Sequence, residues 1–177
     1  PDHLAGQRLR VQMLGWLGEA SAVPTLRQAL DVPALRRLAG GALALLTGSR
    51  PQHDGWRASR PSPAPEADHA LPADDTRQDD PLPWPDAAGF DAWLARQTPL
   101  DPAAGRYFAG RPLTLAWATQ VLARGPLPWR ALAAEHCQRL RGQALFPVHL
   151  PAAAQSARLA LLTQGEAHVA ATGTHPV

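Results

Sequence analysis

Few side chains in this chain have the chemistry of a nucleophile or of an acid–base catalyst. The one cysteine, Cys137, follows His136, and a thiol beside an imidazole is a common nucleophile–base pair. Adjacent residues of a helix point about 100° apart, however, so His136 cannot reach the thiol. His149 stands between two prolines and has no second ligand residue nearby. We therefore expect Cys137 to be an inert, half-buried helix residue and His149 to be a surface or capping residue.

Four aspartates suggest a cation site at first sight: Asp74, Asp75, Asp79 and Asp80. A calcium loop needs ligands at alternating positions around a glycine, and this run has neither feature, so we expect a solvated acidic segment. The sequence also has no glycine-rich phosphate loop, no GxSxG nucleophile elbow and no HExxH pair. We predict that the protein is not an enzyme, with no catalytic residue, cofactor or metal.

The arginines are the remaining candidates, and all 17 basic residues are arginine. Arg36, Arg37, Arg130 and Arg141 lie on expected helices that would stand side by side in a stack. Together with Trp84 they are the predicted partner-binding residues, because arginine and tryptophan are common at binding hot spots. An alternative stays open for Arg36 and Arg130, which recur at matching positions. They would then only tie one repeat to the next or cap a loop.

A repeating pattern determines where these residues lie. Residues 18–48 predict two short helices joined by a tight turn and stopped by Gly48. The second helix recurs 94 residues later, so that Arg36 corresponds to Arg130 and Gly48 to Gly142. The first helix recurs at an offset of 92, which pairs Leu30 with Leu122. A hairpin of this size cannot bury its own apolar face, so the pattern predicts stacked solenoid repeats.

A third copy opens the chain. A shift of 29 places Leu38, Leu43 and Leu46 on Leu9, Leu14 and Leu17. The chain would then begin inside the second helix of a repeat whose first helix is absent, and we expect it to be part of a longer repeat protein. An upstream helix would be needed to cover the apolar side formed by Leu9, Met13 and Trp16.

Charge and proline content divide the chain. Residues 1–50 carry a net charge of +3, residues 51–102 of −6 and residues 103–177 of +5. Eight of the 19 prolines lie between Pro51 and Pro85 of the acidic middle, where there are almost no aliphatic residues, and this composition is typical of an extended linker. We predict helical-hairpin repeats truncated at the N-terminus in 1–50, a Pro-rich acidic linker in 51–83, a C-terminal helical region of similar repeats in 84–165 and a flexible tail in 166–177.

The second half also predicts helices. Asp86 can cap one helix, Thr114 begins a second, and Pro126 and Pro128 pre-set the first turn of a third that runs to about Arg141. Residues 103–110 predict a turn of helix, and a last helix follows from about 152 to 163. Of the tryptophans, we expect Trp56 and Trp84 to be anchors, and we expect the others to lie in the core: Trp16, Trp93, Trp117 and Trp129.

The hairpins resemble HEAT repeats in a short bacterial form, with a Gly-acid turn at Gly18-Glu19 and an arginine, Arg36, early in the second helix. The segments PLPWPDAAGFDAWLARQ, RYFAGRPLTLAWATQVLARG, PWRALAAEHCQRLRG and LPAAAQ are similar to the C-terminal region of a proteobacterial HEAT-like family of uncharacterised function. Some members of that family are encoded near type VI secretion genes. The resemblance covers residues 4–50 and 81–163, and it implies an interaction role.

The expected fold is therefore all-α, a HEAT-like α-solenoid interrupted by the Pro-rich acidic linker. The expected function is a non-catalytic scaffold for another protein, as an accessory or chaperone of a secretion effector or adaptor. The alternative is a nucleic-acid-binding HEAT-like module that uses the arginine-bearing face. No apolar run approaches the length of about 18 residues that a membrane span needs, so we expect a cytoplasmic protein without a membrane partner.

Overall fold

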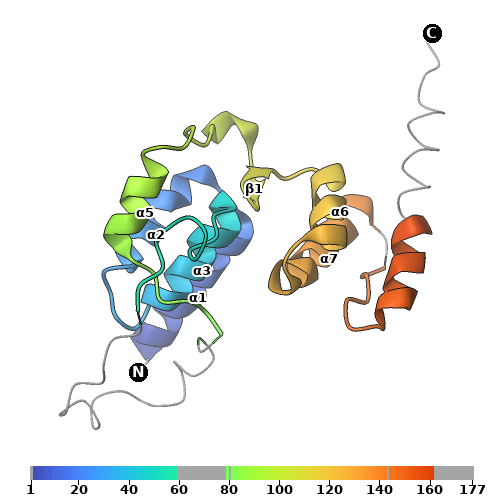
Figure 1. The fold of residues 1–177 in the computed structure, drawn as a ribbon, viewed down its shortest axis with the longest axis horizontal. Coiled ribbons are helices and arrows are strands. Elements are labelled where there is room, and N and C mark those ends of the chain that lie inside the picture. Colours follow the sequence, from blue (N-terminus) through green and yellow to red (C-terminus); the bar gives the residue numbers. More distant parts are fainter. Residues whose placement is uncertain (1, 60–78, 80, 143, 162–177) are drawn as a thin grey trace. The chain divides into compact units, whose positions relative to one another are not determined.

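The computed structural model describes residues 2–59, 79, 81–142 and 144–161 of the protein. These residues are mostly helical, and their strands form one two-stranded sheet (Figure 1). The predicted all-α class is confirmed at this level. The chain divides into two compact units, Pro1–Leu113 and Thr114–Val177. Among the described residues, no helix is long and apolar enough to cross a membrane.

Three helices form the centre of the first unit: α1 (Asp2–Leu17), α2 (Val23–Ala29) and α3 (Arg36–Thr47). A short 3-10 helix, η1 (Ala20–Ala22), joins α1 to α2. α3 packs against both α1 and α2 (Figure 1). Gly48, in the left-handed conformation at φ 73°, ends α3, because only glycine adopts this backbone without strain. The hairpin predicted in residues 18–48 is confirmed.

Leucines fill the space between these helices. Leu26 and Leu30 of the α2 segment and Leu43 and Leu46 of α3 are all fully buried. α1 approaches α3 closely at Gly15, where a Cβ atom would lie only 2.7 Å from the Cβ atom of Ala42. The helices therefore meet through small residues at one point and through leucines elsewhere.

Two further segments of this unit, residues 56–58 and 84–86, lie far apart in the sequence but pair with each other. The main chain of 56–58 pairs with that of 84–86, with Asp86 N donating to Trp56 O at 2.7 Å and Ala58 N to Trp84 O at 2.8 Å. Asp86 then caps α5 (Ala87–Leu94), as predicted, by accepting from Ala88 N. Trp56 is fully buried and meets Phe90 edge-on, with ring centroids 5.2 Å apart. The ends of the predicted 51–83 linker therefore pack on the helices, and its residues 60–78 lie outside the described residues.

The unit ends in a β-hairpin. A 3-10 helix, η3 (Pro102–Ala104), precedes β1 (Tyr107–Phe108) and β2 (Arg111–Pro112), which are antiparallel. Ala109 and Gly110 connect them with φ values of 49° and 81°, the pattern of a tight two-residue hairpin turn. The predicted turn of helix over residues 103–110 is thus wrong beyond Ala104. The helical region predicted over residues 84–165 is split between the two units, because residues 84–113 belong to the first unit.

The second unit contains α6 (Leu115–Arg124), α7 (Leu127–Arg141) and a helix over residues 152–161. Thr114 caps α6 by accepting from Trp117 N at 3.1 Å, as the sequence predicts. α7 has a proline in its first turn and ends at Gly142, which is left-handed at φ 67°. Its core is small and apolar, with Ala118, Leu122 and Ala133 fully buried.

Candidate interaction surface

Arg36 and Arg130, two of the predicted binding residues, hold main-chain oxygens inside their own units. Arg36 Nε donates to Leu30 O at 2.7 Å, and Arg130 Nε donates to Leu122 O at 2.7 Å. Both carbonyls lie at or near the end of the helix that precedes the arginine, where carbonyls lack partners within the helix. These positions match in the sequence repeat, so the geometry favours the capping alternative for this pair.

Arg37 and Trp84, two further predicted binding residues, contact each other. Arg37 donates through Nε (3.1 Å) and Nη2 (2.9 Å) to Leu82 O, and its guanidinium lies 5.1 Å from the centroid of the Trp84 ring. A cation over an aromatic face is attracted to the electrons of the ring. Trp84 is therefore an anchor within the chain, where it helps to fasten residues 82–85 to α3. Trp56, the other expected anchor, is likewise internal.

Arg141, the fifth predicted residue, lies on α7 in the second unit. It is half-buried and lines a cavity of about 240 Å³ within this unit. Cys137, Phe146 and Arg158 are among the other lining residues. Arg36, Arg37 and Trp84 lie in the first unit and Arg130 and Arg141 in the second, and the contacts described for Arg36, Arg37, Trp84 and Arg130 are made within their own units.

One acidic residue of the predicted solvated run is deeply buried. Asp79 Oδ2 and Oδ1 accept from Arg8 Nη1 (2.9 Å) and Nη2 (2.8 Å), and both side chains are less than 10% exposed. Arg8 Nη1 also donates to Ala34 O at 3.0 Å. The prediction of a solvated residue is wrong for Asp79. Asp74, Asp75 and Asp80 lie outside the described residues.

Of the three residues considered for nucleophilic or acid–base chemistry, two are buried and one is exposed. Cys137 is 6% exposed on α7, and its Sγ lies 3.8 Å from Thr119 Oγ1. His136 is buried and His149 is exposed. Within the described part of the chain, no three His, Cys, Asp or Glu side chains are grouped so that they could hold a metal ion.

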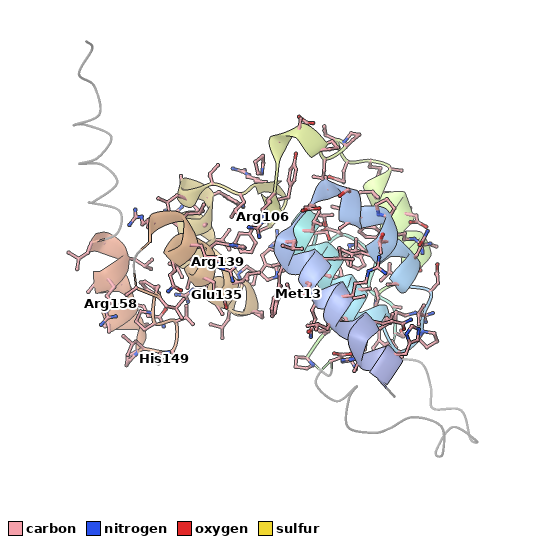
Figure 2. The ribbon with its side chains drawn as sticks, turned by 180° about the vertical axis from the view of Figure 1, so that it is seen from behind. Met13, Arg106, Glu135, Arg139, His149 and Arg158 are labelled. Atoms are coloured by element: carbon pink, nitrogen blue, oxygen red, sulfur yellow. The ribbon has the colours of Figure 1, made fainter. Side chains whose placement is uncertain are left out.

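Helix α1 carries a row of exposed apolar side chains. Leu9, Met13 and Trp16 are 57%, 40% and 48% exposed, and we call these three residues the open stripe. Their spacing puts them on one face of the helix, away from Val11 and Gly15, which are buried. Figure 2 labels Met13 on this helix. The prediction that Trp16 lies in the core is wrong, whereas the expected uncovered apolar side of α1 is observed.

The end of α1 is already capped. Arg106 donates through its guanidinium to the carbonyl oxygens of Trp16 and Leu17 (Arg106 is labelled in Figure 2). The main chain at Trp16 is thus satisfied while its indole ring stays exposed. The sequence signal for this surface is that α1 carries apolar residues on two faces, although α3 can cover one of them.

No family model, curated protein or solved structure matches this chain.

Proposed function

We propose that the protein is a non-catalytic helical scaffold that binds another protein through the open stripe of α1. The observation that carries this proposal is the exposure of three large apolar side chains, Leu9, Met13 and Trp16, in one row. Single exposed apolar residues are ordinary on a protein surface, whereas a contiguous apolar patch marks an interaction site. A Trp and a Met within such a patch are residues enriched at interfaces.

The HEAT-like α-solenoid is part of this proposal. It is supported by two features that occur at matching positions of the sequence repeat. Arg36 and Arg130 make the same bond to the preceding helix, and Gly48 and Gly142 both end their helices in the left-handed conformation. With the family resemblance, this supports an accessory or chaperone role for a secretion effector or adaptor.

The arginines support a nucleic-acid function less well. Phosphate binding needs guanidinium groups that face solvent together. Arg36, Arg37 and Arg130 instead donate to main-chain oxygens within the fold. We therefore place the binding surface on α1 and not on the arginine-bearing helices.

A photo-cross-linking amino acid at position 13 of the full chain, expressed in the native host, would test the proposal. Mass spectrometry would identify the cross-linked protein, and its binding to purified wild-type chain and variants would then be measured. We expect Met13→Glu to lower the affinity at least tenfold and the melting midpoint to stay unchanged, because the side chain is exposed. Leu127→Glu is the matched control, since Leu127 is 68% exposed on α7, and it should bind normally.

Two results would contradict the proposal. Equal binding by wild type and Met13→Glu would show that the open stripe is not part of the interface. A captured nucleic acid whose affinity falls steeply between low and moderate salt would favour the nucleic-acid alternative.

A further inference from the structure

The open stripe of α1 has a counterpart on α3. Both helices end in a left-handed glycine, Gly18 at φ 71° and Gly48 at φ 73°. Counted back from these glycines, Leu9, Met13 and Trp16 correspond to Ala39, Leu43 and Leu46. The helix ends thus give an offset of 30, one more than the 29 that the leucines alone indicated.

The two sets of residues differ completely in exposure. Ala39, Leu43 and Leu46 are all 0% exposed. They lie in a core to which the α2 segment contributes Leu26 and Leu30, both also 0% exposed. α3 packs against α1 as well, through Ala42, which meets Gly15. On α3 these positions are therefore enclosed in the core, and the short helix α2 that precedes α3 contributes to that core.

The far side of α3 is also closed. A Cβ atom at Gly40 would lie 3.0 Å from the Pro85 side chain, and one at Gly41 would lie 3.3 Å from that of Leu82. The segment 82–85 thus fills the small-residue face of α3, and Arg37 and Trp84 fasten it there. Within the described first unit, α1 is the helix that leaves a long apolar face uncovered.

We propose that the open stripe receives a short amphipathic helix of the α2 type, which pairs with α1 as α2 pairs with α3. The partner helix carries leucines four residues apart, as Leu26 and Leu30 are, and packs them on Met13. This inference rests on the proposed protein-binding function and specifies the element of the partner that binds. A second copy of this chain could not offer its own α2 as this helix, because Leu26 and Leu30 are already buried in it.

The chain itself provides a reporter, since Met13 is its one methionine. Exposed methionine thioethers are oxidised by peroxide to sulfoxide, and mass spectrometry measures the rate. We would extend the full chain at its N-terminus by a copy of residues 19–35, which holds the α2 segment and its connecting turn and contains no methionine. The same extension carrying Leu26→Glu and Leu30→Glu in the added copy is the matched control, because it cannot pack on an apolar face.

The expected result is slower oxidation of Met13 by severalfold and a rise in melting midpoint of about 4 °C or more in the extended chain. Both effects should vanish in the control. Equal oxidation rates in all three proteins would overturn the inference. Protection of Met13 in the unextended chain that grows with protein concentration would overturn it in favour of a second copy. If the extension failed while Met13→Glu still abolished binding to the cross-linked partner, the proposed function would stand without this inference.

Discussion

Arg36 and Arg130 make the same hydrogen bond in two separate units of the chain. The Nε of each donates at 2.7 Å to a carbonyl oxygen at or near the end of the preceding helix, Leu30 O or Leu122 O. The offsets of the two arginines and of the two leucines differ by two residues, which the connecting loop absorbs. The bond is therefore a shared feature of two helical hairpins and fixes how the second helix follows the first.

Loss of this bond should lower stability. We expect Arg36→Ala to reduce the free energy of unfolding of the first unit by about 1.5 to 3 kcal/mol, because a charged donor is removed from the carbonyl of the buried residue Leu30. Urea unfolding followed by circular dichroism would measure it. Arg10→Ala is the control: Arg10 is exposed on α1 and its change should stay within about 0.5 kcal/mol. Equal effects of the two substitutions would contradict the capping role.

The buried pair of Arg8 and Asp79 gives the second prediction. Removing one partner leaves an uncompensated charge in the interior, so Asp79→Ala should cost about 3 to 5 kcal/mol. The double variant Arg8→Met with Asp79→Leu should recover much of this loss, because apolar residues of similar size can replace a buried ion pair. Chemical unfolding of Arg8→Met, Asp79→Leu and the double variant completes the double-mutant cycle. A loss below about 1 kcal/mol for Asp79→Ala would show that this pair is not buried in solution.

The contacts of Arg36 and Arg8 show which parts of the structure the sequence could predict. The bond of Arg36 reaches back only six residues, and the helix, its turn and its glycine stop are all local signals. The pair of Arg8 and Asp79 joins residues 71 positions apart, and nothing around Asp79 distinguishes it from the aspartates beside it. Burial of Trp56 against Phe90 is equally non-local. Pairings of this kind depend on the tertiary fold, which periodicity and capping motifs do not encode.

The missed β-hairpin has a similar cause. Its turn lies at the end of α3, where Ala109 N and Gly110 N donate to Leu45 O and Leu46 O at 2.7 and 3.1 Å. Two-residue strands are too short to show an alternating pattern, so the sequence around Tyr107 gave no strand signal. The open stripe, in contrast, was predictable in outline, because α1 is apolar on more faces than one neighbouring helix can cover.

Gly48 and Gly55 form a matched pair for testing how this hairpin sits on α3. Both are left-handed, at φ 73° and 79°, so alanine at either position costs about 1 to 2 kcal/mol of backbone strain. At Gly48 the new Cβ would also lie 2.6 Å from Ala109 O, whereas nothing lies within 4 Å at Gly55. Thermal unfolding should therefore show a clearly larger loss for Gly48→Ala. Similar losses would mean that the turn at Ala109 does not pack on the end of α3.

The last prediction concerns the exposed pair of Arg27 and Asp91, which ties α2 to α5. Arg27 Nε and Nη2 donate to the two oxygens of Asp91 at 2.6 and 2.7 Å. The hydrogen bond from Arg27 lowers the pKa of Asp91, while partial burial opposes this shift. The stabilisation is thus complete above the pKa of an unfolded aspartate, about 3.9, and is lost as the pH falls through the lower folded value.

Asp91→Asn should therefore cost a small amount at pH 7, about 0 to 1 kcal/mol because Asp91 is half exposed. The difference between wild type and variant should shrink as the pH is lowered below about 4. Melting midpoints measured from pH 7 to pH 2 would follow it, and Arg27→Gln should remove the same pH dependence, since the shift needs the guanidinium. A difference between wild type and Asp91→Asn that stayed constant down to pH 2 would mean that the ion pair does not form in solution. α5 would then be held without this ion pair, by contacts such as that of Phe90 with Trp56.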